Sequence, residues 1–110
     1  MSYDFEMFID TGGQELRALA GYDNLNYTYN VSPMFCKAFG PNGIHVLAEQ
    51  KGKKCIPKII KAIKDMKKNS KAYKELNPAN GWGCYEGALV TLKTLLKWCV
   101  ENPKATLVIQ

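Results

Sequence analysis

Apolar residues recur with a period of two at both ends of this 110-residue chain and with a helical period between the ends. Residues 3–10 alternate in the way that predicts a strand with one buried face, ended by Thr11-Gly12-Gly13. Residues 105–110 alternate in the same way, whereas residues 85–99 carry apolar side chains at helical spacing, which predicts the helix that anchors the core. The sequence therefore predicts an α+β fold, in which a small antiparallel or mixed sheet includes both terminal strands and packs against three to five helices.

Shorter elements are predicted from turn and cap residues. Ser32-Pro33 is predicted to start a helix, with the serine hydroxyl as its cap. Pro57 is predicted to open the next helix, and Ser70 to cap a further short one. Residues 16–20 alternate less clearly and favour a second strand. No linker, repeat or low-complexity stretch interrupts the sequence, so residues 1–110 are expected to form a single domain.

Positive charge is concentrated in one segment of the chain. Residues 51–74 hold ten of the fifteen basic residues and one acidic residue, Asp65, so the segment has a net charge of +9 and the remainder −4. Four of its lysines, Lys58, Lys61, Lys64 and Lys68, are predicted to lie opposite a stripe of isoleucines on one helix. This pattern is typical of a solvated helix face. It also suits a surface that attracts an anionic partner, although duplex DNA is disfavoured because arginine, the best reader of bases, occurs once.

Missing signals exclude several classes of protein. No apolar run approaches the ~20 residues that span a bilayer, and the first residues lack the pattern of a signal peptide, so no membrane association or export is expected. The four cysteines are widely separated and His45 is the only histidine, so the closely spaced ligands of a zinc site are missing. We therefore predict no metal and no cofactor, and four reduced, mostly buried thiols.

Catalytic signatures are also missing from the sequence. It contains no Walker loop, no dinucleotide-binding glycine fingerprint and no G-x-S-x-G motif. An acidic cluster of Asp4, Glu6 and Asp10 is explained equally well by the solvated face of a strand. We therefore predict no catalytic residue and favour a binding protein over an enzyme, with a hydrolase acting on a nucleotide as the remaining enzymatic alternative.

A tryptophan turn directly before the main helix is the most informative segment. In Asn80-Gly81-Trp82-Gly83, followed by Cys84 and Tyr85, glycines flank an indole at a helix start. Free backbone amides at the positive end of a helix dipole can hold a phosphate or carboxylate, and the indole can stack on a flat ring. The alternative is a structural turn whose tryptophan fills a gap under the loop.

A second candidate segment alternates amide and phenol side chains, in Asn26, Tyr27, Tyr29 and Asn30. Such side chains can present donors and acceptors to the edge of a base or to a sugar hydroxyl. The alternative is an edge strand whose tyrosines cover the core while its asparagines form local turns. Because Ser32-Pro33 follows at once, this segment also leads into a helix start.

Three parts of the chain, residues 26–38, residues 77–83 together with 85–88, and residues 102–106, resemble a family of short proteins encoded by phages and prophages. No activity is assigned to that family, so the resemblance provides no catalytic residue. It implies a phage-type accessory protein, with counter-defence as one such role, located in the cytoplasm of an infected or lysogenic bacterial cell.

These observations predict a protein that binds or sequesters a small phosphorylated or nucleotide-like ligand without turnover. The predicted ligand-binding residues are Asn26, Tyr27, Tyr29, Asn30, Asn80, Gly81, Trp82, Gly83 and Tyr85. The alternative is an inhibitor that binds a host protein through a basic and aromatic surface. The sequence does not decide whether the protein forms a homo-oligomer that completes its pocket across a subunit interface.

Overall fold

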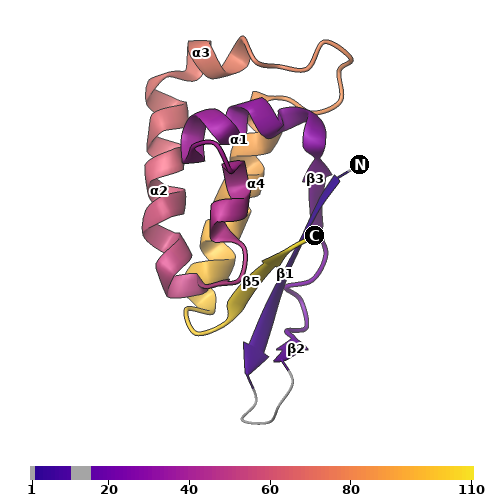
Figure 1. The fold of residues 1–110 in the computed structure, drawn as a ribbon, viewed down its shortest axis with the longest axis vertical. Coiled ribbons are helices and arrows are strands. Elements are labelled where there is room, and N and C mark those ends of the chain that lie inside the picture. Colours follow the sequence, from indigo (N-terminus) through magenta and orange to yellow (C-terminus); the bar gives the residue numbers. More distant parts are fainter. Residues whose placement is uncertain (1, 11–15) are drawn as a thin grey trace.

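The computed structural model describes residues 2–10 and 16–110 (Figure 1). The turn predicted at residues 11–13 lies outside the described residues. The strands are β1 (Ser2–Asp10), β2 (Leu16–Ala18), β3 (Leu25–Thr28), β4 (Gln50–Lys51) and β5 (Thr106–Ile109). The α-helices are α1 (Ser32–Phe39), α2 (Gly52–Lys68), α3 (Ser70–Lys74) and α4 (Tyr85–Glu101). Two 3-10 helices, η1 (Tyr29–Val31) and η2 (Gly43–Leu47), flank α1.

The five strands form one antiparallel sheet around β1. The order β2-β1-β5-β4 places the strands from the two ends of the chain side by side in the middle. β3 pairs with Ser2–Phe5 of β1, and β2 pairs with Phe8–Asp10. Because β5 occupies the other edge of β1, β2 and β3 share one edge, and the two terminal strands belong to the sheet as predicted.

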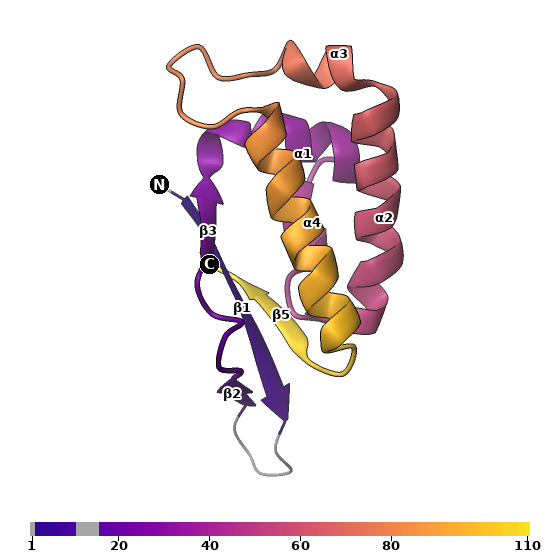
Figure 2. The same cartoon turned by 180° about the vertical axis from the view of Figure 1, so that it is seen from behind.

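All of the helices lie on one side of this sheet (Figures 1 and 2). Tyr3, Phe5 and Met7 point toward the helices and are buried, whereas Asp4 between them is exposed. The main contribution from α4 is a row of buried side chains, Tyr85, Ala88, Leu92, Leu95 and Cys99. The alternating apolar residues of β1 and the helically spaced apolar residues of α4 therefore pack into one core. The predicted α+β fold is confirmed.

The prediction for the start of α2 is wrong. The helix begins at Gly52, and Pro57 lies inside it. The Gly52 amide donates to the Ala105 carbonyl (2.7 Å) and the Lys53 amide to the Pro103 carbonyl (2.9 Å). No side chain caps this helix start, and these bonds provide the acceptors that the first amides of the helix need. The helix can therefore start before its proline.

Two other local predictions also need correction. Neither Ser32 nor Ser70 caps a helix with its hydroxyl, because each is the first residue inside its helix. The isoleucine stripe of α2 is interrupted at Ile60, which is 36% exposed.

The four cysteines are free thiols, of which Cys55 and Cys99 are buried and Cys36 is exposed. Among the helices of the described residues, none combines the length and the apolar character needed to cross a bilayer.

Candidate functional site

The two segments predicted to bind a ligand meet at the edge of the sheet. A hollow of about 630 Å³ opens beside β3, and the turn before α4 forms its other wall. Its lining residues are Ser2, Asn26, Tyr27, Thr28, Gly81, Trp82 and Gly83. Five of the nine predicted site residues are among them, although the two segments are more than fifty residues apart in the sequence.

Tyr27 fixes β3 to the start of α4. Its hydroxyl oxygen accepts a hydrogen bond from the Cys84 amide (2.9 Å), and its ring lies so close to Gly87 that a Cβ there would overlap the hydroxyl. Burial raises the pKa of the Tyr27 hydroxyl, and the backbone hydrogen bond at Cys84 partly offsets this rise. At Gly83, a Cβ would lie 2.5 Å from the Thr28 methyl carbon. Glycine at both positions therefore permits the close approach that forms the hollow.

The tryptophan turn holds its indole outside the core. The side-chain oxygen of Asn80 accepts a hydrogen bond from the Trp82 amide (2.9 Å), and both neighbouring glycines have positive φ, +75° at Gly81 and +90° at Gly83. Trp82 is 68% exposed. The alternative prediction, an indole that fills a gap under the loop, is wrong, and the ring is available for stacking.

Several of the backbone amides predicted to bind an anion already have acceptors within the chain, including the Gly81 amide, which donates to the Pro78 carbonyl (3.2 Å). The Tyr85 amide donates to the Asn77 side-chain oxygen (2.8 Å), and the Gly87 amide donates to the Cys84 sulfur (3.4 Å). Glu86 adds a negative charge to the same turn. None of the described residues that line the hollow is basic. With these amides bonded, Glu86 in the first turn and no cation among the described lining residues, the hollow favours a flat ring and amide contacts over a phosphate.

Four of the nine predicted residues do not line the hollow, and Asn80 among them belongs to the tryptophan turn beside it. Tyr29 packs edge-on against Tyr3, with ring centroids 4.3 Å apart. The Asn30 side-chain amide donates to the Thr28 hydroxyl oxygen (2.9 Å), which makes Asn30 part of a local turn. Tyr85 is buried and donates its hydroxyl proton to the Met66 carbonyl (2.8 Å). Tyr29 and Asn30 therefore support the fold, as the alternative interpretation of their segment expected, and Tyr85 does so from the start of α4.

Two lining residues, Ser2 and Thr28, were not predicted. Thr28 follows Tyr27 in β3, and Ser2 of β1 is paired with Thr28 in the sheet. The alternating pattern identifies the first strand but not the strand that pairs with it, so the sequence carries no signal for Ser2.

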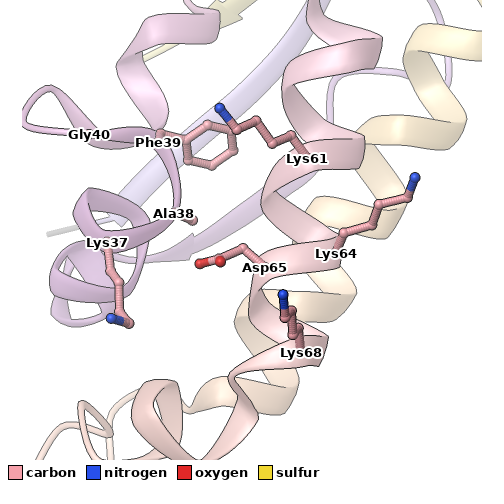
Figure 3. Close-up of a pocket in the computed structure, with 8 residues that line it drawn as sticks. All are labelled: Lys37, Ala38, Phe39, Gly40, Lys61, Lys64, Asp65 and Lys68. Carbon is pink, nitrogen blue, oxygen red and sulfur yellow. The ribbon is translucent and has the colours of Figure 1, made fainter.

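A second hollow, of about 540 Å³, lies between α1 and α2 (Figure 3). Its lining residues are Lys37, Ala38, Phe39, Gly40, Lys61, Lys64, Asp65 and Lys68. The amino group of Lys64 points away from α1, and the carboxylate of Asp65 points into the space between the two helices (Figure 3). Four lysines and one acid make this the cationic hollow of the molecule.

Asp65 is held in place by neighbouring donors. Its carboxylate accepts hydrogen bonds from the Tyr73 hydroxyl and from the Asn69 side-chain amide (3.0 Å). Burial, together with the hydrogen bond to Asp65, raises the pKa of the Tyr73 hydroxyl. The hydroxyl therefore remains a donor at neutral pH. Lys37 lies over the same ring, with its nitrogen 5.5 Å from the centroid, so this network orders the wall of the hollow.

Within the described part of the chain, no three His, Cys, Asp or Glu side chains group as ligands for a metal ion. Comparison of the chain with protein-family models, with curated proteins and with solved structures found no match.

Proposed function

We propose that this protein binds a nucleotide-like ligand in the hollow beside β3 and does not convert it. The observation that carries the proposal is the exposed Trp82 ring, held by a constrained turn in a hollow that Asn26 of the edge strand β3 also lines. An indole stacks on any flat ring, and an amide supplies both a donor and an acceptor to the edge of that ring.

The nucleobase, rather than the phosphate, provides the binding energy in this proposal. The described lining residues include no lysine or arginine, and the Tyr85 and Gly87 amides at the start of α4 already have acceptors. A phosphate on the ligand would extend from the hollow into solvent. A nucleoside and its monophosphate should therefore bind with dissociation constants within about threefold of each other, since an exposed charge contributes well under 1 kcal/mol.

A protein that holds such a ligand without turnover acts by sequestering it. This is the accessory role, with counter-defence as one example, that the resemblance to phage proteins implies.

Tryptophan fluorescence tests the proposal directly. The chain has two tryptophans, and Trp98 is buried edge-on against Tyr22, so a ring that stacks in the hollow should quench Trp82 selectively. We expect saturable quenching by nucleosides and nucleotides. Trp82→Ala should weaken binding about 10- to 100-fold in calorimetry, because stacking of one base contributes about 1–3 kcal/mol. Trp82→Phe should retain part of the affinity, and Val90→Ala, an exposed change on α4, should retain all of it.

The same titration can refute the proposal. A ligand at a hundred times its Kd should stabilise the fold by about 2.7 kcal/mol. A panel of purine and pyrimidine nucleosides and nucleotides that neither quenches the fluorescence nor shifts the melting temperature would rule out this hollow as a nucleotide site. Product formation during long incubation would replace simple binding with the hydrolase alternative.

A further inference from the structure

A groove runs along the other side of the molecule, between α2 and the segment formed by α1 and η2. Beside the cationic hollow lies a smaller one, of about 260 Å³, and the two share Ala38, Phe39 and Lys61. The smaller hollow is lined by Ala38, Phe39, Val46, Lys58 and Lys61. This groove shares no described lining residue with the hollow beside β3. Figure 1 places α2 and β3 on opposite sides of the fold.

The floor of the groove is apolar at one end. Ala38, Phe39 and Val46 are each half-buried and packed against the core. The stem of Lys61 extends alongside the Phe39 ring (Figure 3), and lysine stems of this kind cover apolar surface while their amino groups stay in water. The smaller hollow therefore provides an apolar contact for an inserted side chain.

The rim of the groove is cationic at regular spacing. Lys58, Lys61 and Lys68 are exposed on α2, and residues three, four and seven positions apart share one helix face. Lys37 adds a fourth charge from α1. Asp65 is the single acid among the described residues that line the groove, and its carboxylate already accepts bonds from Tyr73 and Asn69.

From this juxtaposition we infer that the groove is a protein-docking site for an acidic amphipathic segment of a partner protein. An apolar side chain of the segment enters the smaller hollow, and its carboxylates face the lysines on the rim. Complementary charge then sets the orientation and speeds association. This inference is independent of the nucleotide site, because it uses different residues on a different side of the fold.

A nucleic acid fits the groove less well. Bases bind to single-strand sites by stacking on exposed aromatic faces. Phe39, the aromatic residue among the described residues of the groove, is half-buried and packs edge-on against Phe35, with centroids 6.3 Å apart. The cations that line the groove are lysines, which lack the planar fork with which arginine reads phosphates and bases.

Fluorescence anisotropy with a labelled peptide tests the inference. The probe is a helical peptide of about 14 residues, ~21 Å long, in which Leu and Phe form one stripe and Glu the rest. Two control peptides replace every Glu with Gln or every apolar residue with Ser, and a labelled thymidine oligonucleotide represents nucleic acid. We expect binding of the acidic amphipathic probe, with affinity falling as salt rises, and at least about tenfold weaker binding of each control peptide and of the oligonucleotide.

Paired charge reversals locate the binding surface on the full chain. Lys61→Glu with Lys68→Glu should weaken probe binding at least about tenfold, because two attractive pairs become repulsive. Lys93→Glu with Lys97→Glu makes the same change of net charge on exposed positions of α4 and should change the Kd less than twofold. Val46→Ser should weaken binding at unchanged charge, and Trp82→Ala should have no effect on the peptide.

Several outcomes would overturn the inference. Equal losses in both double variants would show attraction by net charge alone. Tighter binding of the oligonucleotide than of the peptide, lost in the Lys61/Lys68 variant, would assign the groove to nucleic acid. Absence of binding by the acidic probe at low salt, with circular dichroism confirming folded protein, would remove the docking site and leave the nucleotide proposal untouched.

Discussion

Gly87 shows how one missing side chain joins the two halves of the candidate site. It lies in the first turn of α4, where a Cβ would overlap the Tyr27 hydroxyl. The Tyr27 hydroxyl thereby accepts a hydrogen bond from the Cys84 amide, and Tyr27 forms part of the wall of the hollow. Because Gly87 has no Cβ, the Tyr27 ring can lie against α4. This contact also holds β3 beside the tryptophan turn.

Gly87→Ala should destabilise the fold by about 1–3 kcal/mol, because the added methyl forces Tyr27 out of its position. The sign is informative: inside a helix, alanine in place of glycine ordinarily stabilises by about 1 kcal/mol. Urea unfolding followed by circular dichroism measures the difference. A variant as stable as the original protein, or more so, would show that Tyr27 does not pack on α4 in solution.

The start of the helix α2 could not be predicted from the residues next to it in the sequence. Its first amides bond to the carbonyls of Pro103 and Ala105, and a Cβ on Gly52 would lie 2.6 Å from the Asn102 carbonyl oxygen. The helix start is set by the turn after α4, about fifty residues away in the sequence. Pro57, whose fixed φ favours a helix start, instead leaves the Lys53 carbonyl without the amide that would bond to it in a continuous helix.

Pro57→Ala should therefore raise the free energy of unfolding by about 1–2 kcal/mol, the helix gain being reduced by the greater freedom of the unfolded chain. Pro33→Ala is the matched control. Pro33 lies in the first turn of α1, where its missing amide has no helical partner to lose, so this change should not stabilise. Thermal and urea unfolding of both variants separate the two cases, and equal effects would contradict the role assigned to Pro57.

The elements that were predicted correctly include β1, β5 and α4, which have periodic patterns, and α1, whose start at Ser32-Pro33 was predicted from its turn residues. The burial of the periodic elements follows from spacing alone, so the sequence suffices. β4 is only two residues long and owes its existence to pairing with β5, which no local pattern records. The candidate site divides in the same way: Trp82 and Asn26 could be identified by residue type, whereas the bond from Tyr85 to the Met66 carbonyl depends on a contact that only the folded chain makes.

At the scale of the whole molecule, the lysines remain concentrated on one helix while the aromatic hollow lies elsewhere. Seven of the lysines lie on α2, and Lys64 has like-charged neighbours at Lys61, Lys67 and Lys68, three or four positions away. Each such pair destabilises a helix by about 0.2–0.5 kcal/mol at low salt. A surface that repels itself in the free protein and attracts an acidic partner is expected to trade stability for binding.

This charge distribution predicts that the free protein becomes more stable as salt rises. Between about 0.01 M and 0.15 M sodium chloride the screening length falls from ~30 Å to ~8 Å, which weakens repulsion among the α2 lysines. Lys64→Gln should raise the unfolding free energy by about 0.5–1 kcal/mol at the lower salt concentration, and most of this gain should disappear at the higher one. Urea unfolding at both concentrations measures this difference. If added salt left the original protein unchanged or destabilised it, the lysine face would not be a source of instability, and its concentration on α2 would need a different physical account.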